Sequence, residues 1–380
     1  MVVGANFLAV AARMSLVTFL GIYFVRHAGI ALATVGVAFL CESAMRGLAA
    51  PMFGALSDRI GRRALLVGSA LATAAVLPSF LLVDGPRALL VWSLALGLTG
   101  AVNMPVASAL LLDLAPAQRR QSVLALNYTG MSVAYTLGVV PAGYVAQQGY
   151  GALAATAALG YVLVAALYLA ALRGPLPLER LRGDSVLRDT VSAFRDARFL
   201  GFAALALAFP LGMGMVVTAS PVFGAELGLG EGYIGLVLGG NSILVALGAL
   251  PAAARLEPLG PFRVLGAAAF MVSAAFLCYA LVPDPAWALL AGTVVFSLGE
   301  IVFSSAVPAA VARLAPAGRR GAYQGGWALV SSFAMGSALA LSGLLTPLAG
   351  WSGAWLAYAA ATLAAAIGLL RLRGRFMPAS

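Results

Sequence analysis

Long apolar runs, separated by short polar breaks, restrict the fold of this chain more than any other feature. A helix that crosses a bilayer needs about 20 apolar residues, and twelve runs of roughly this length can be drawn between arginines, acids, prolines and glycines. They lie near 5–25, 33–55, 64–83, 88–111, 121–145, 151–172, 199–222, 233–254, 263–282, 286–310, 321–345 and 352–371. Only 9% of the residues are charged, whereas a soluble chain needs about 25% to cover its surface. The pattern predicts an all-α polytopic membrane protein with twelve transmembrane helices.

The arginines are unevenly distributed around these runs. All 23 basic residues are arginine, and 19 of them fall on one side of the membrane if the N-terminus is cytoplasmic. Only Arg26 and Arg87 fall on the other side. Cytoplasmic loops carry such an excess of positive charge, so both termini and the segment 173–198 are expected to be cytoplasmic. Orientation alone explains the net charge of +10, and no nucleic-acid partner is expected.

Few residues in the chain suit catalysis or metal binding. His27 is the only histidine, and Cys41 and Cys278 both lie inside apolar runs. This leaves little material for a nucleophile–base pair or for a metal site, so a membrane-embedded enzyme is a remote alternative. Without any lysine the chain has no phosphate-binding Gly-Lys-Ser/Thr loop. We therefore expect no enzyme activity, no cofactor, no metal and no ATP drive.

The chain also repeats itself. The stretch 114–120, Leu-Ala-Pro-Ala-Gln-Arg-Arg, recurs 200 residues later at 314–320 as Leu-Ala-Pro-Ala-Gly-Arg-Arg. This offset predicts two six-helix bundles, 1–172 and 199–380. The linker 173–198 keeps an apolar face through Val186, Leu187, Val191 and Phe194, as an amphipathic helix on the membrane surface would. Repeated halves around a central site are typical of transporters.

A short motif between the second and third runs carries a family resemblance. The stretch 54–63, Gly-Ala-Leu-Ser-Asp-Arg-Ile-Gly-Arg-Arg, resembles the signature loop of the major facilitator superfamily, Gly-x-Leu-x-Asp-Arg-x-Gly-Arg-Arg/Lys. The resemblance implies the major facilitator fold and alternating access. It also implies a cytoplasmic latch that closes in the outward-facing state, made by Gly54, Asp58, Arg59, Gly61, Arg62 and Arg63. The copy at 255–263 is degraded, and no latch is assigned to it.

A narrower resemblance lies around the tenth run. Gly299-Glu300-Ile301-Val302, followed by Pro316 and by Gly-Ala-Tyr-Gln-Gly at 321–325, resembles bacterial multidrug–proton antiporters. This implies proton-coupled efflux of amphiphilic small molecules, a role for Glu300 in proton handling, and a place in the plasma membrane of a prokaryote. The chain departs from that group at Asn127, which stands where an aspartate often precedes the tyrosine. Efflux or uptake of sugars or metabolites, which the superfamily also hosts, is the alternative.

Four charged residues lie well inside the apolar runs, where each costs at least about 2.5 kcal/mol. They are Arg13, Glu42, Arg46 and Glu300. Glu42 and Arg46 are four residues apart and can pair on one helix face. With Arg13 they form either a substrate and proton site or a structural ion cluster. Glu300 has no basic neighbour within its own run, which suits a proton carrier, although a permanently protonated structural glutamate is the alternative.

Uncharged polar residues inside the runs are the remaining candidates for the substrate cavity. Each of them can instead form a hydrogen bond between helices. They are Asn103, Asn127, Tyr128, Asn241, Tyr323 and Gln324. We expect a monomer whose partners are a small-molecule substrate, protons and membrane lipid.

Overall fold

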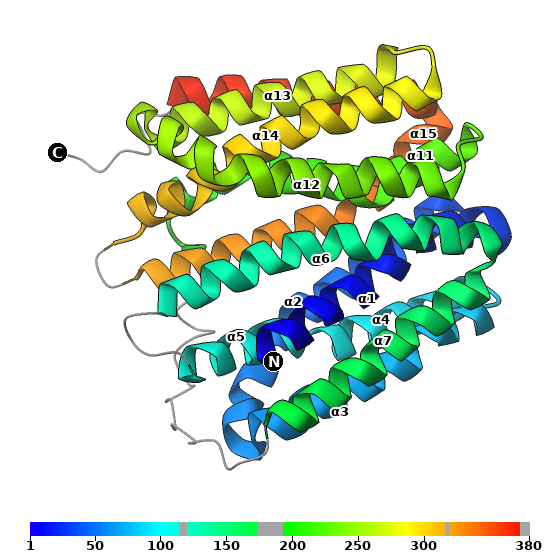
Figure 1. The fold of residues 1–380 in the computed structure, drawn as a ribbon. Coiled ribbons are helices and arrows are strands. Elements are labelled where there is room, and N and C mark those ends of the chain that lie inside the picture. The colour runs from blue at the N-terminus through cyan, green and yellow to red at the C-terminus, as the bar shows by residue number, and fades with distance from the viewer. Residues whose placement is uncertain (115–119, 173–192, 317–318, 373–380) are drawn as a thin grey trace. The chain divides into compact units, whose positions relative to one another are not determined.

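Every regular element in the described part of this computed structural model is helical (Figure 1). The structure describes residues 1–114, 120–172, 193–316 and 319–372. Within these ranges ten helices are long and apolar enough to cross a membrane. A helix satisfies its own backbone hydrogen bonds, which lipid cannot do, and the predicted all-α membrane fold is confirmed. The count of twelve stays a prediction, since the last span joins two helices and the 29-residue helix over 120–148 is not among the ten.

The chain forms two compact units, each considered by itself. The first comprises Met1–Gly183 and Gly230–Gly239, and the second comprises Asp184–Leu229 and Gly240–Ser380. Most of the predicted linker, 173–192, lies outside the described residues, and so does most of its predicted amphipathic helix.

The first unit is built from helices in which apolar residues cover nearly the whole circumference, as expected in lipid. Their packing joins α1 to α6 and α7, α2 to α4, and α3 to α7. In chain order they are α1 (Val2–Ile22), the π-helical η1 (Tyr23–His27), α2 (Leu32–Ile60), α3 (Arg62–Val76), the 3₁₀ turn η2 (Pro78–Leu82), α4 (Pro86–Gly100), α5 (Asn103–Leu114), α6 (Arg120–Gln148) and α7 (Tyr150–Ala171).

The second unit contains the longest helices. Here α13 packs against both α14 and α15. The elements are α9 (Ala197–Ala206), α10 (Ala208–Gly214), the π-helical η4 (Met215–Ala219), α11 (Ser220–Glu226), α12 (Glu231–Leu256), the 3₁₀ turn η5 (Glu257–Leu259), α13 (Pro261–Leu281), α14 (Pro285–Leu314) and α15 (Arg320–Leu372). The start of α12 belongs to the first unit. Asp196 and Asp284 cap α9 and α14 by accepting backbone N–H bonds.

Prolines divide two of the predicted runs. The run at 88–111 is split between α4 and α5. Because Pro105 has no N–H, it cannot donate to the carbonyl of Ala101, four residues earlier, where the helix is interrupted. Pro210 has the same effect at Ala206, the last residue of α9. In α15 the break is at Gly350, whose φ of 65° lies outside the helical range.

The predicted signature loop is not a loop over most of its length, which corrects the sequence-based expectation. Residues 54–60 form the last two turns of α2, and α3 begins at Arg62. Only Gly61 is non-helical, with φ 92° and ψ 135°, a conformation that is strained for any residue with a Cβ. A charged segment does not need to leave the helix when the helix itself continues beyond the hydrocarbon region.

Candidate functional site

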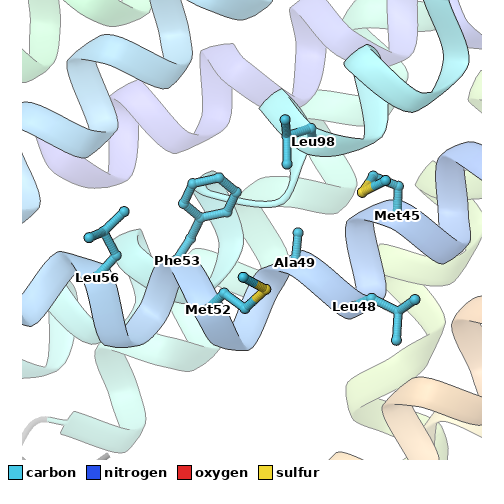
Figure 2. Close-up of a pocket in the computed structure, with 7 residues that line it drawn as sticks. All are labelled: Met45, Leu48, Ala49, Met52, Phe53, Leu56 and Leu98. Atoms are coloured by element: carbon cyan, nitrogen blue, oxygen red, sulfur yellow. The ribbon is translucent and has the colours of Figure 1, made fainter. Parts of the chain in front are cut away.

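One face of α2 lines an apolar pocket of about 500 Å³. The residues recur every three or four positions, as one face of a helix requires, and α4 adds one further side chain (Figure 2). They are Met45, Leu48, Ala49, Met52, Phe53, Leu56 and Leu98. Every lining side chain is apolar, so the pocket suits the hydrophobic part of a small molecule.

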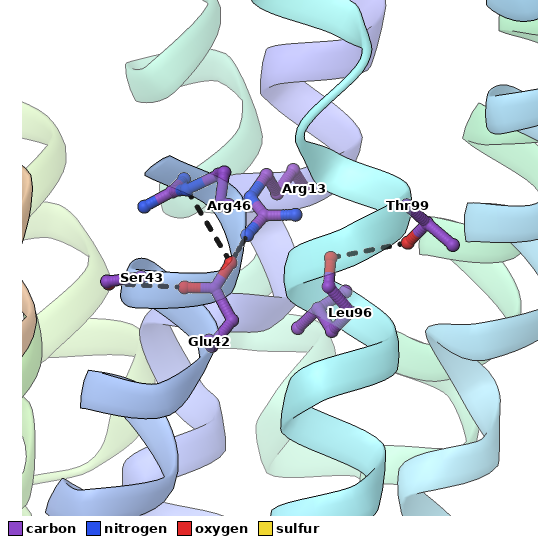
Figure 3. A network of polar contacts seen from close by, with 6 residues as sticks. All are labelled: Arg13, Glu42, Ser43, Arg46, Leu96 and Thr99. Atoms are coloured by element: carbon purple, nitrogen blue, oxygen red, sulfur yellow. Dashed lines mark hydrogen bonds and ion pairs between the residues drawn. The ribbon is translucent and has the colours of Figure 1, made fainter. Parts of the chain in front are cut away.

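The structure brings together three of the predicted charged residues (Figure 3), and the two on α2 lie within one helical turn of Met45, the first residue that lines the pocket. Arg13 Nη2 donates to Glu42 Oε1, while Arg46 Nε lies 3.7 Å from the same oxygen. Ser43 Oγ donates to Glu42 Oε2 at 3.3 Å. The side chains of Arg13 and Glu42 are 10% and 11% exposed, whereas that of Arg46 is 35% exposed. The cluster therefore has a buried pair and one more accessible guanidinium.

Two glycines allow α4 to approach this cluster. A Cβ at Gly97 would collide with the backbone carbonyl oxygen of Glu42 and would lie 3.0 Å from Met45 Cβ. A Cβ at Gly100 would lie only 2.8 Å from Arg13 Nη1. Sequence reasoning missed both glycines, because only the packing of α2 against α4 gives them a role.

The cluster carries a net positive charge when all of its members are ionised. Two guanidinium groups face one carboxylate, and the phenol of Tyr161 on α7 adds a neutral partner for Arg13. Removing one member of a buried ion pair leaves the others uncompensated and is strongly destabilising. The arrangement can thus stabilise the first unit and present positive charge at the same time.

The fourth predicted charge, Glu300, has a different environment in the second unit. Glu300 is 9% exposed, and Asn241 Nδ2 donates to its Oε2 at 3.2 Å. Ser297, one turn earlier in α14, donates its Oγ to Asn241 Oδ1 at 2.6 Å. In the described ranges no arginine lies within ion-pair distance of Glu300. The predicted residues Asn241 and Glu300 are therefore together, and Ser297 is a partner that sequence reasoning missed.

Asn127 belongs to a separate, uncharged network in the first unit. Asn6 Nδ2 donates to Asn127 Oδ1 at 3.0 Å, and Asn103 Nδ2 donates to Asn6 Oδ1 at 2.9 Å. Tyr168 Oη donates to Asn103 Oδ1 at 2.9 Å. These four residues join α1, α5, α6 and α7. Asn6 and Tyr168 were missed, although Asn6 lies seven residues before Arg13 on the same face of α1.

Tyr323 and Gln324 lie apart from Glu300's partners, near the start of α15. Tyr323 Oη donates to Asp196 Oδ2 at 2.7 Å, and Gln324 Nε2 donates to the carbonyl of Pro308 at 3.0 Å. Partial burial raises the pKa of Asp196, but hydrogen bonds from Tyr323 and from the backbone N–H groups of Arg198 and Phe199 outweigh it. The pKa of Asp196 consequently lies below its ordinary value.

The predicted latch is described only in part. Gly54 is within α2, the side chain of Arg62 is buried, and that of Arg63 is exposed. The side chains of Asp58, Arg59 and Tyr128 lie outside the described part of the structure. Among the described residues, no group of three histidines, cysteines or acids could hold a metal ion.

Comparison with known proteins identifies the family. The family model of the Major Facilitator Superfamily matches residues 2–233 and again 202–378. A Na(+), Li(+), K(+)/H(+) antiporter of Planococcus maritimus is 32% identical over 127 residues. That alignment spans 32% of this chain and 29% of the antiporter, so the chain matches less than a third of its relative's length.

Solved transporters share the fold over almost the whole chain. The nucleoside transporter NupG is 15% identical, with a TM-score of 0.79 and coverage of 98% of both chains. A POT family transporter in complex with 5-aminolevulinic acid is 16% identical, with a TM-score of 0.80, and the match covers 99% of this chain and 96% of that one. At these identities the likeness shows the fold alone. The family match, which extends across both units, shows that this chain is a multi-pass membrane transporter of the Major Facilitator Superfamily.

Proposed function

We propose that this transporter is proton-coupled, works by alternating access and exports amphiphilic small molecules. The observation that carries the proposal is the environment of Glu300, a buried carboxylate whose described partners are all neutral. Intramembrane ionisable residues are costly and usually functional. The pocket on α2 and the neighbouring charges support a substrate with both apolar and polar parts.

Glu300 has the properties required of the proton carrier. Its ionised form accepts one hydrogen bond, from the amide of Asn241, and pairs with no described arginine. The surroundings therefore stabilise the ionised form only weakly. A change in access to water would then favour uptake or release of the proton. Glu42 is the second candidate for this role, but two guanidinium groups favour its ionised form.

A second candidate function is exchange of alkali-metal cations for protons. The relative from Planococcus maritimus is named as such an antiporter, which supports proton exchange in general and a cation substrate in particular. Transport of a sugar or another metabolite is the further alternative. The solved neighbours, which include a nucleoside transporter, support no choice among these substrates because their sequence identity is about 15%.

The proposal includes the orientation and setting of the protein. The distribution of 19 of the 23 arginines favours cytoplasmic N- and C-termini. The proposed setting is the plasma membrane of a prokaryote, with the chain working as a monomer. Single cysteines at Asp84 and Arg313, in a background without Cys41 and Cys278, should be labelled from opposite sides of the membrane. Labelling of the Arg313 position by an impermeant reagent outside intact cells would contradict this orientation.

Glu300→Gln tests proton coupling directly. In proteoliposomes, we expect the variant to lose most transport of a fluorescent amphiphile that is driven by an imposed pH gradient, by about tenfold or more. Counterflow of the same dye without a gradient should stay within about twofold, since glutamine keeps the shape of the site and removes only the titrating group. Replacing the dye with Na⁺ or K⁺ in the same assay tests the second candidate function.

Glu226→Gln is the matched control, because Glu226 is exposed and glutamine can still accept the hydrogen bond from Trp351 Nε1. It should leave both measurements unchanged. Gradient-driven transport at the wild-type level in Glu300→Gln would refute the assignment and make Glu42 the residue to test next.

A further inference from the structure

The apolar pocket and the charge cluster lie next to each other along α2. Met45 lines the pocket and also contacts the position of Gly97, where α4 meets the backbone of Glu42. Leu98, the residue after Gly97, lines the pocket as well (Figure 2). Glu42 precedes Met45 by three residues and Ala49 by seven, so these side chains share a face of the helix. Arg46 precedes the lining residues Ala49 by three positions and Phe53 by seven, so its side chain shares their face of α2 beside the start of the pocket.

Arg46 supplies an accessible charge beside the pocket. Glu42 Oε1 accepts a hydrogen bond from Arg13, and Oε2 accepts one from Ser43. Arg46 Nε lies 3.7 Å from Oε1, beyond the usual 2.7–3.2 Å of an N–H···O hydrogen bond. A guanidinium has five N–H donors, and the side chain of Arg46 is 35% exposed. It can therefore pair with an incoming anionic group without breaking the Arg13–Glu42 pair.

We propose that this site binds an amphiphilic organic anion, with its apolar body in the α2 pocket and its anionic group paired with Arg46. The inference rests on the proposed transport function and names the substrate class for it. A volume of about 500 Å³ is within the range of small-molecule sites. With Arg13, Glu42 and Arg46 ionised the cluster has a charge of +1, which attracts an anion and repels an organic cation where the dielectric is low.

Two fluorescent probes with the same rings separate the anionic group from the apolar body. 8-Anilinonaphthalene-1-sulfonate carries a sulfonate, and N-phenyl-1-naphthylamine lacks it. Binding is measured to the purified full-length protein in nanodiscs of zwitterionic lipid, with the signal of empty nanodiscs subtracted. We expect the wild-type protein to bind the sulfonate about tenfold more tightly than the amine, as one charge-assisted contact would give.

Substitutions in and near the α2 pocket test whether the preference for the sulfonate arises there. Arg46→Gln should lower the affinity for the sulfonate about tenfold and leave that for the amine within about twofold, whereas Arg46→Lys should keep the preference. Ala49→Trp should weaken the binding of both probes by filling the pocket. The exposed residues Arg87 and Leu159 provide the controls Arg87→Gln and Leu159→Trp, which should bind as the wild type does.

Equal binding of the two probes by the wild-type protein would overturn the inference, and this result needs no variant to fold. An undiminished sulfonate preference in Arg46→Gln would also overturn it. These measurements use no pH gradient, so their failure would leave proton coupling through Glu300 standing. Conversely, wild-type gradient-driven transport in Glu300→Gln would refute the coupling proposal and leave anion binding at α2 untouched.

Discussion

Among the described residues, each unit of this transporter buries one glutamate inside its helices, and the two glutamates have opposite surroundings. In the first unit Glu42 contacts the guanidinium groups of Arg13 and Arg46. In the second unit Glu300 contacts Asn241, which in turn is held by Ser297. Counted over the whole residue, Glu42 and Glu300 are exposed to nearly the same extent, 8% and 9%, so burial does not distinguish them.

The difference shows how one residue type can serve two purposes in the same fold. A carboxylate between two cations is held ionised and contributes to the structure as a counter-ion. For a carboxylate among neutral donors, the free energies of the protonated and the ionised form differ less, so the group can change between them. Replacing each glutamate with glutamine therefore separates the two roles.

The largest expected effect is on stability. Glu42→Gln leaves Arg13 and Arg46 without their counter-ion, and we expect it to lower the free energy of unfolding by about 3–5 kcal/mol. Glu300→Gln should change it by less than about 1 kcal/mol, because no described cation depends on Glu300. Thermal unfolding of both variants in detergent measures the difference, with Glu226→Gln as the control. Similar destabilisation by both substitutions would remove the distinction between the two sites.

A smaller loss of stability than that of Glu42→Gln is expected when the asparagines Asn6 and Asn241 are replaced instead of the glutamates. Asn6→Leu removes the central residue of the network in the first unit and leaves the half-buried Asn103 and the buried Asn127 without their partner. We expect a loss of about 1–3 kcal/mol of stability and an unchanged pH dependence of transport. Asn241→Leu, in contrast, should change that pH dependence because it removes the donor to Glu300.

Thr156→Val is the control for this pair, since the hydroxyl of Thr156 is exposed and bonds only the carbonyl of Leu153 in its own helix. It should alter stability by less than about 0.5 kcal/mol. Suppose that Asn6→Leu shifted the pH profile of transport as much as Asn241→Leu does. The neutral hydrogen-bond partners of Glu300 would then not identify it as the proton carrier.

The smallest expected effect concerns Asp196, a third carboxylate, which lies at the start of α9 beyond the apolar span. Its folded pKa is below the ordinary value, so its stabilising effect is fully present above the unfolded pKa, near 3.9, and is lost as pH falls through the folded pKa. Tyr323→Phe removes one of the bonds that lower this pKa. We expect the variant to lose about 0.5–1 kcal/mol at pH 7, a figure reduced for solvent screening.

This loss should shrink as pH falls below about 4, because protonation removes the charge that the phenol stabilises. Melting temperatures of the wild type and Tyr323→Phe, recorded between pH 7 and pH 3, test this directly. A difference that does not depend on pH would mean that Tyr323 acts through packing on Phe199, whose ring lies 5.2 Å away between centroids, and not through Asp196.

The sequence could predict the helices because hydrophobicity in lipid is a local property of each segment. The predicted run 151–172 corresponds to α7, Tyr150–Ala171, and the run 263–282 corresponds to α13, Pro261–Leu281. The end of α2 could not be predicted, because the helix continues through the charged residues Asp58 and Arg59 and ends only at Gly61. Hydrophobicity reports where a segment enters lipid, and it does not report where its backbone hydrogen bonds end.

The charged part of the candidate site was predictable, including the association of Arg13 on α1 with Glu42 on α2. The spacing of Glu42 and Arg46 fixes their pairing on α2. The closeness of α4 depends on Gly97 and Gly100, and the position of Ser297 beside Asn241 depends on how α12 meets α14. These contacts are set by tertiary packing, and a single sequence contains no direct signal for them.

The connection between α2 and α3 has a mechanical consequence. Gly61 alone separates the two helices, and neighbouring Cα atoms are about 3.8 Å apart, so the chain has almost no slack at this end. The corresponding turn before α13 inserts the 3₁₀ residues Glu257–Leu259 ahead of Gly260, whose φ of 77° resembles that of Gly61. During a conformational change, α2 and α3 must consequently tilt together about a common hinge, whereas α12 and α13 have three more residues in which to rotate independently.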